Sequence, residues 1–178
     1  MRLLSSYYNN IVTYDFIIKF NNNKPSVPKF SKLVLSLNTK NDSLINLVSS
    51  SIALELITNQ KTKYILRKVP QNLNIKVKFG VPTGCTVTLR RGNLLNLLTN
   101  LFITNPEYTR LNAVSFRRNG RINVSFGINN FSSFKLIEKN YYLFRELRNI
   151  NVSLITNSID YNIYNFLLTS FKLLRGDS

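Results

Sequence analysis

Polar side chains that can bind phosphate and ribose recur at every second position between residues 86 and 90. Thr86, Thr88 and Arg90 alternate there with apolar residues, which is the period-two pattern of a β-strand with one apolar face. Arginine donates hydrogen bonds from a planar fork, and a threonine hydroxyl both donates and accepts, so this row suits the oxygens of a sugar–phosphate backbone. A solvated sheet face is the alternative, and for this segment alone it is the more common explanation.

A second polar row consists of Arg121, Asn123 and Ser125, and apolar residues fill the alternate positions from Ile122 to Ile128. This alternation predicts another strand, with the polar residues facing outward. Such a polar face, flanked by lysines and arginines, can follow the wide, shallow minor groove of A-form RNA and contact its 2′-hydroxyls.

The segment from residue 61 to residue 78 is basic and contains no acid. Its cations are Lys61, Lys63, Arg67, Lys68, Lys76 and Lys78. The last two share one face of an alternating run, where point charges suit phosphate binding better than base reading. The alternative is a lysine-edged strand whose charges block edge-to-edge aggregation.

The net charge predicts a polyanionic partner. The 24 Lys and Arg and 8 Asp and Glu give a charge of +16, so the partner is nucleic acid or an anionic membrane surface. Residues 1–55 contribute +3 (six basic, three acidic) and residues 138–178 contribute +1 (five basic, four acidic). Residues 56–137 contribute +12 (thirteen basic, one acidic), so we expect the middle of the chain to face the partner.

The composition excludes most catalytic and metal chemistry. The chain has no histidine, one methionine and one cysteine, which excludes a zinc cluster, a histidine acid/base pair and an internal disulfide. The eight acids are scattered, with no spacing that pairs two of them on one element, so we predict no enzyme, no metal and no cofactor. Cys85 lies in an apolar alternation and is expected to be a buried thiol. An RNA-processing enzyme and a basic protein of the membrane surface are the alternative functions.

The location of the protein is inferred from composition. No run approaches the about 18 consecutive apolar residues of a membrane span, and the N-terminus lacks the apolar core of a signal peptide. The 26 asparagines, against two alanines and six glycines, indicate an A+T-rich gene, which is typical of organelle genomes. We therefore expect an organelle-encoded protein of the mitochondrion, and the alternatives are a plastid and the cytoplasm of an A+T-rich bacterium.

We expect one domain over residues 1–178, because no linker rich in Pro, Gly or Ser divides the chain. Strands are expected at 32–38 and 150–156, and Asn93 is expected to cap a leucine-rich helix that packs on the apolar face of the strand at 85–89. Helices are also expected after Ser5 or Ser6 and after Asp42 or Ser43. Their predicted buried residues are Tyr7, Ile11, Tyr14 and Ile18 in the first, and Leu44, Leu47 or Val48, Ile52 and Leu56 in the second.

The segment Gly80–Arg90 reads G-V-P-T-G-C-T-V-T-L-R. It resembles the G-x-P-x-G-C-x-V-T-L-R signature of the fifth protein of the large ribosomal subunit, the family that binds 5S rRNA. Residues 54–61 are similar to the family's helix end and G-Q-K turn, and residues 120–127 to its G-R-x-N-x-S-x-G strand. Residues 34–38 and 148–156 resemble its first and late strands in matching order, so the likeness covers nearly the whole chain.

The resemblance implies an α+β fold, in which a single antiparallel-rich sheet has helices packed mainly on one face. It also implies a mitochondrial-type ribosomal protein seated on 5S rRNA, or its equivalent, in the central protuberance beside neighbouring rRNA and proteins. It further implies a bridge to a small-subunit head protein, and contact with P-site tRNA through the loop before Gly80. In this chain the tRNA-facing residues are Asn72, Leu73, Asn74, Lys76 and Lys78.

Four positions match the family's RNA contacts, namely Asn38, Gln60, Thr88 and Arg90. The chain departs from the family pattern at Thr39-Lys40-Asn41, where the family has a glycine-rich turn, and at Arg91, where the family has glycine. With the basic and polar residues identified above, the candidate RNA-binding residues are Asn38, Gln60, Lys61, Lys63, Arg67, Lys68, Thr86, Thr88, Arg90, Arg91, Arg121 and Asn123.

Overall fold

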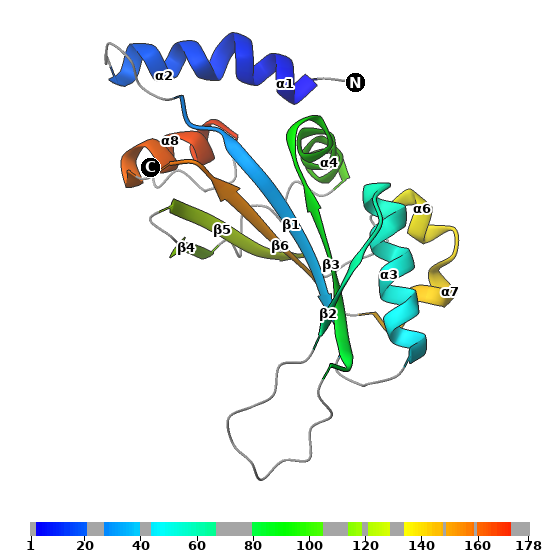
Figure 1. Cartoon of the computed structure of the whole chain (residues 1–178). Helices are drawn as coiled ribbons and strands as arrows, with labels where there is room; N and C mark the ends of the chain where they lie inside the picture. Colours follow the sequence, from blue (N-terminus) through cyan, green and yellow to red (C-terminus); the bar gives the residue numbers. More distant parts are fainter. Residues whose placement is uncertain are drawn as a thin grey trace, which may run out of the picture. The chain divides into compact units, whose positions relative to one another are not determined.

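The described strands form a six-stranded sheet in the order β2-β3-β1-β6-β5-β4 (Figure 1). The computed structural model describes residues 3–20, 27–39, 44–66, 80–104, 114–118, 121–128, 134–147, 149–158 and 160–171. The strands are β1 (Phe30–Asn38), β2 (Lys63–Leu66), β3 (Pro82–Leu89), β4 (Val114–Arg118), β5 (Arg121–Ile128) and β6 (Ile150–Thr156). The helices are α1 (Leu3–Tyr7), the π-helical turn η1 (Tyr8–Val12), α2 (Thr13–Phe20), α3 (Leu44–Thr58), α4 (Arg91–Thr104), α6 (Lys135–Glu138), α7 (Tyr141–Phe144) and α8 (Tyr161–Ser170).

Hydrogen bonds between neighbouring strands show that the sheet is antiparallel. The N–H of Thr39 donates to the carbonyl of Thr83, and the Thr86 hydroxyl donates to the carbonyl of Leu35, so positions rise along β1 as they fall along β3. The ladders of β2 with β3 and of β4 with β5 are antiparallel too. The same reversal relates β1 to β6 and β6 to β5, in bonds that join Ser31 with Ile155, Lys29 with Asn157, Ser125 with Ser153, and Thr156 with Ile122. The predicted α+β fold with an antiparallel sheet is confirmed.

The chain divides into two compact units, which are described separately. The first consists of Met1–Val34, Thr88–Gly127 and Val152–Ser178, and the second of Leu35–Val87 and Ile128–Asn151. The expectation of one domain stays a prediction.

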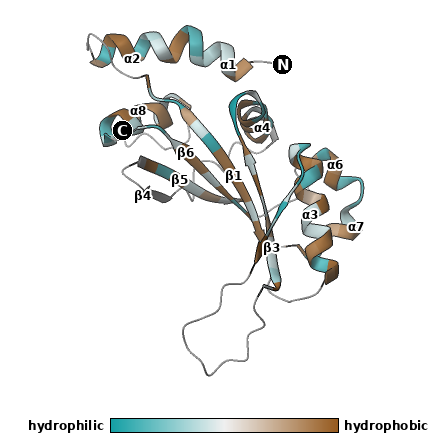
Figure 2. Cartoon of the chain, viewed as in Figure 1, coloured by the Kyte–Doolittle hydropathy of each residue, from teal (hydrophilic) through white to brown (hydrophobic). Residues whose placement is uncertain are grey.

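The period-two patterns of the sequence predict the sheet faces of β1 and β3 correctly. In β1 the side chains of Leu33, Leu35 and Leu37 are buried, whereas Val34 and Ser36 between them are half-buried, and Figure 2 shows the hydropathy along the strand. In β3 the side chains of Cys85, Val87 and Leu89 are buried, whereas Thr86 is half-buried and Thr88 is exposed. The strands therefore bury one face and leave the hydroxyl row accessible.

In the first unit, the N-terminal helix packs against α8 through aromatic side chains. The ring centres of Phe16 and Phe166 lie 5.7 Å apart, and the hydroxyl of Tyr7 donates to the carbonyl of Ser170 at 3.0 Å. The Tyr8 hydroxyl donates to the carbonyl of Pro28, and burial raises the pKa of Tyr8 to about 12. These contacts fix the helix on the unit's core.

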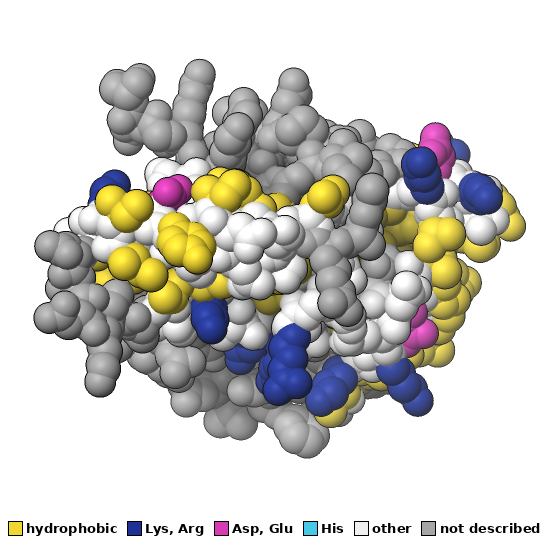
Figure 3. Space-filling model, turned by 90° about the horizontal axis from the view of Figure 1, so that it is seen from above, with side chains coloured by type: hydrophobic (Ala, Val, Ile, Leu, Met, Phe, Trp, Pro, Cys, Tyr) yellow, Lys and Arg dark blue, Asp and Glu magenta, His cyan; other side chains and the backbone are white. Residues whose placement is uncertain are grey.

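The sequence predicts the wrong buried face for this helix. Ile11, Tyr14 and Ile18 are exposed, whereas Val12 and Phe16 are buried, and hydrophobic side chains accordingly gather on the helix surface seen in Figure 3. A π-helical turn contains more residues than an α-helical turn, so η1 shifts the phase of the helix by about one residue. A stripe spaced for an uninterrupted α-helix then points away from the core.

In the second unit, α3 covers the buried thiol of Cys85. The Ser50 hydroxyl lies 3.4 Å from the Cys85 sulfur, and that sulfur lies 3.7 Å from the carbonyl oxygen of Leu47. Cys85 is fully buried, as predicted, and burial raises the pKa of its thiol although the Ser50 hydrogen bond acts in the opposite direction. These contacts of Cys85 come from α3, and the expectation that the leucine-rich helix packs on this strand face stays a prediction.

The buried face of α3 also differs from the prediction. Leu44 and Ile52 are exposed, and the small residues Ser50 and Ala53 are buried beside Leu54. Apolar residues occur nearly all round this helix, so their spacing does not select one face. Small side chains permit the close approach to β3 that the Ser50–Cys85 contact shows.

Candidate nucleic-acid interface

The end of α3 forms the turn that carries Gln60 and Lys61. Asn59 follows the last helical residue with a left-handed φ of 52°, and its N–H donates to the carbonyl of Glu55 at 2.8 Å, which ends the helix. The N–H of Gln60 donates to the Thr58 hydroxyl at 3.3 Å. Gln60 is half-buried and Lys61 is exposed, so the turn is anchored at its base and presents a cation to solvent.

The side chain of Glu55 secures the next residue of this turn. One of its carboxylate oxygens accepts hydrogen bonds from both the N–H of Thr62, at 3.0 Å, and the Thr62 hydroxyl, at 3.1 Å. These bonds lower the pKa of the Glu55 carboxyl, the backbone bond most, and the nearby charge of Lys61 contributes less. The ionised carboxylate therefore closes a loop from the helix to the start of β2.

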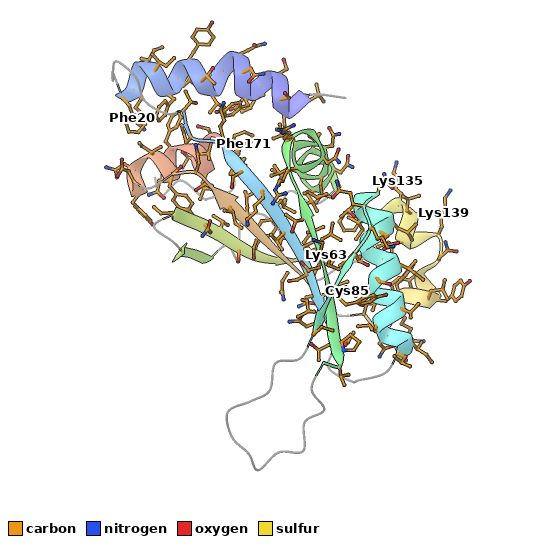
Figure 4. All side chains as sticks on the ribbon, viewed as in Figure 1. Phe20, Lys63, Cys85, Lys135, Lys139 and Phe171 are labelled. Atoms are coloured by element: carbon orange, nitrogen blue, oxygen red, sulfur yellow. The ribbon has the colours of Figure 1, made fainter. Side chains whose placement is uncertain are left out.

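Lys63 lies opposite Thr86 in the ladder of β2 with β3, so the two side chains share one face. Lys63 is exposed, and Figure 4 labels it on this part of the sheet. The Thr86 hydroxyl donates to the carbonyl of Leu35 at 3.0 Å, so its proton is used in a hydrogen bond between β3 and β1. Thr86 retains acceptor capacity toward a ribose hydroxyl, and Lys63 supplies the cation.

Asn38, at the end of β1, lies against Gly84 of β3. A side-chain carbon built on Gly84 would lie 2.5 Å from the carbonyl oxygen of Leu37 and 2.9 Å from Oδ1 of Asn38. Only glycine permits this approach, and Asn38 itself is exposed. We call Asn38, Gln60, Lys61, Lys63 and Thr86 the second-unit polar surface.

Thr88, Arg90 and Arg91 belong to the first unit, and all three are exposed. The helix α4 begins at Arg91, two residues before the predicted cap at Asn93. Arg91 has a left-handed φ of 53°, which turns the chain sharply from β3 into α4. Two guanidinium groups are therefore exposed at this turn, close in sequence to the exposed Thr88.

The amino-acid sequence of the chain is similar to those of known ribosomal proteins. The large ribosomal subunit protein uL5m of Reclinomonas americana is 28% identical over 179 residues, which cover 97% of both chains. The chain resembles the uL5 proteins over nearly its whole length. The uL5 of Blochmanniella floridana is 28% identical over 97% of this chain and 92% of its own, and that of Nitrosomonas europaea is 26% identical over 97% of both. No family model matches the chain.

The likeness to uL5 proteins confirms the resemblance predicted from the motifs. The first of these relatives is mitochondrial by name and the other two are bacterial. All three relatives are named as ribosomal proteins and none as an enzyme. Their names confirm the prediction that this chain is not an enzyme.

The prediction that Asn123 faces outward is wrong. Asn123 is 2% exposed, and its neighbours Ile122 and Val124 on the opposite face are buried too. Tyr164 of α8, itself fully buried, donates its hydroxyl to the carbonyl of Asn123 at 3.5 Å. Both faces of β5 are therefore covered at this end, and period-two spacing cannot reveal such double coverage.

The remaining candidate residues lie partly or wholly outside the part of the chain that the structure describes. The β5 backbone begins at Arg121, but its side chain is outside the description. Seven further candidates lie outside the described residues: Arg67, Lys68, Asn72, Leu73, Asn74, Lys76 and Lys78.

The sequence alone did not reveal the hydrogen bonds that Glu55 accepts from Thr62. It also did not reveal the close approach of β1 that requires glycine at position 84. Glu55 is the one acid between Asp42 and Glu107, a signal that marks it as unusual in a basic stretch.

Across the described segments, no group of three His, Cys, Asp or Glu residues could hold a metal ion, and no helix could span a membrane.

Proposed function

We propose that this protein is a structural constituent of the large ribosomal subunit and binds rRNA. The observation that carries the proposal is the second-unit polar surface, in which exposed Lys63 lies opposite Thr86 across the β2–β3 ladder and exposed Lys61 precedes it in the adjoining turn. Lysines supply the phosphate attraction and the polar groups contact sugar oxygens, a combination that suits an RNA backbone. The names of the relatives and the net charge of +16 support the same conclusion.

The RNA in this proposal is 5S rRNA, or the segment that replaces it, in the central protuberance of a mitochondrial ribosome. The exposed side chains of Thr88, Arg90 and Arg91 add a second contact with neighbouring rRNA. Support for the mitochondrial location comes from the A+T-rich composition and from the mitochondrial relative.

The remaining partners follow from the resemblance alone. They are P-site tRNA, which the segment at residues 72–78 approaches, a small-subunit head protein that forms an intersubunit bridge, and the other proteins of the central protuberance. Arg67 and Lys68 are included in the proposed RNA contact because of their charge.

A salt titration with matched lysine variants tests the proposal. We expect RNA affinity to fall steeply with salt, and Lys61→Ala with Lys63→Ala to reduce the slope of log K against log salt by about one per lost phosphate contact. Lys135→Ala with Lys139→Ala is the control, since both of these lysines are exposed on or beside α6 in the same unit (Figure 4).

The outcome also separates the RNA partners. Binding should favour 5S rRNA over tRNA and over an unrelated RNA of equal length, because specific sites exceed the non-specific electrostatic term. A flat salt response, or equal losses in the two lysine pairs, would contradict the proposed surface. Crosslinking within the assembled ribosome then identifies the attached RNA.

A further inference from the structure

Glu55 places a negative charge beside the second-unit polar surface. It is the sole acid among residues 43–106, a stretch with eight Lys and Arg. A carboxylate near a phosphate weakens binding by like-charge repulsion, so charge alone gives Glu55 an unfavourable effect on RNA affinity. Its contacts within the turn indicate a compensating role.

Those contacts hold the turn at two successive points. The backbone carbonyl of Glu55 accepts the N–H of Asn59 at 2.8 Å, and its carboxylate accepts the N–H and the hydroxyl of Thr62 at 3.0 and 3.1 Å. Residues 59–62 are thus tied to one helical residue at both ends. Lys61 lies inside the tied segment and Lys63 directly follows it, so the position of both cations depends on these bonds.

From this geometry we infer that Glu55 is a positioning residue, which holds the turn at residues 59–62 so that Lys61 and Lys63 are presented to rRNA. The inference rests on the proposed function. A turn that is already ordered loses less conformational entropy when RNA binds, and this gain exceeds the repulsion between the carboxylate and the phosphates.

Two substitutions of Glu55 separate positioning from charge. Glu55→Ala removes both the charge and the acceptor, and it should lower the affinity for 5S rRNA about three- to tenfold, the cost of ordering one or two side chains at binding. Glu55→Gln removes the charge but keeps an oxygen that accepts from Thr62, so affinity should equal or exceed that of the wild type. Thr62→Val removes only the hydroxyl bond and should cause a smaller loss than Glu55→Ala.

Amide hydrogen exchange provides a readout other than affinity. The N–H of Thr62 should exchange faster in Glu55→Ala than in the wild type, and it should stay protected in Glu55→Gln. If Glu55→Ala binds RNA as tightly as the wild type, or more tightly, charge repulsion dominates and the positioning role is overturned.

The lysine variants distinguish this failure from a failure of the proposed function. If Lys61→Ala with Lys63→Ala lowers RNA affinity and Glu55→Ala does not, the proposed RNA surface is supported and the positioning role of Glu55 is contradicted. If the lysine pair has no effect, the proposed surface itself is wrong.

Discussion

The Thr86 hydroxyl donates a hydrogen bond of 3.0 Å to the carbonyl oxygen of Leu35, whereas Thr88, two residues further along β3, is exposed. The two threonines therefore differ in hydrogen bonding and exposure although they belong to the same alternating row. Thr86→Val should lower the free energy of unfolding by about 1 kcal/mol, the net value of one hydrogen bond. Thr88→Val should change it by no more than about 0.5 kcal/mol and should weaken RNA binding.

Urea denaturation and RNA titration of both variants test this difference. Equal losses of stability in Thr86→Val and Thr88→Val would show that the Leu35 bond contributes nothing measurable. Unchanged RNA affinity in Thr88→Val would remove Thr88 from the proposed contact.

Gly84 and Gly92 make a matched pair for testing close approach. A side-chain carbon at Gly84 would meet the Leu37 carbonyl at 2.5 Å and Asn38 Oδ1 at 2.9 Å, whereas one at Gly92 would meet nothing within 4 Å. Gly84→Ala should therefore separate β1 from β3 and cost about 1–3 kcal/mol, as overpacking does. Gly92→Ala, within α4, should stabilise the protein by about 0.5–1 kcal/mol.

Thermal or chemical unfolding measures both glycine effects. A tolerated Gly84→Ala would mean that the strands adjust at little cost and that Asn38 is not fixed by its contact with Gly84. The RNA affinity of that variant then reports whether the position of Asn38 matters.

The two faces of β3 also differ in the expected cost of truncation. Leu89 is buried, so Leu89→Ala should cost about 2–4 kcal/mol from lost burial and the resulting cavity. Arg90→Ala, at an exposed position, should change stability by no more than about 0.5 kcal/mol and should lower RNA affinity. Comparable losses of stability in the two variants would show that the assignment of exposed and buried positions at the end of β3 is wrong.

The sequence predicts β3 and β6 well because the buried face of each follows from a period-two alternation. Val87 and Thr88 differ in burial as their positions require, and the bounds expected for the strand at 150–156 match those of β6. The period of a strand is an integer, so no phase error accumulates along it.

The helices and the ends of elements are harder to predict for physical reasons. A helical stripe depends on a constant turn, and η1 breaks that constancy between Tyr7 and Thr13. Asn123 is buried by residues far away in sequence, such as Tyr164, which alternation within β5 cannot reveal. The Glu55–Thr62 bonds depend on the left-handed residue at Asn59, a conformation that spacing alone does not show.

The buried thiol of Cys85 should make stability depend on alkaline pH. Burial raises the pKa of Cys85 more than the Ser50 hydrogen bond lowers it, so the folded state favours the neutral thiol. The resulting stabilisation is complete below the thiol pKa of the unfolded chain, about 8.5, and is lost as pH rises through the higher pKa of the folded state.

The comparison of wild type with Cys85→Ala isolates this effect from tyrosine and lysine titration. Between pH 7 and pH 10, the free energy of unfolding of the wild type should fall more steeply than that of the variant, whatever the difference between them at pH 7. Measurement by urea denaturation at each pH gives the two slopes. Parallel curves would mean that the thiol has the same pKa in the folded and unfolded states, which contradicts its burial beneath α3.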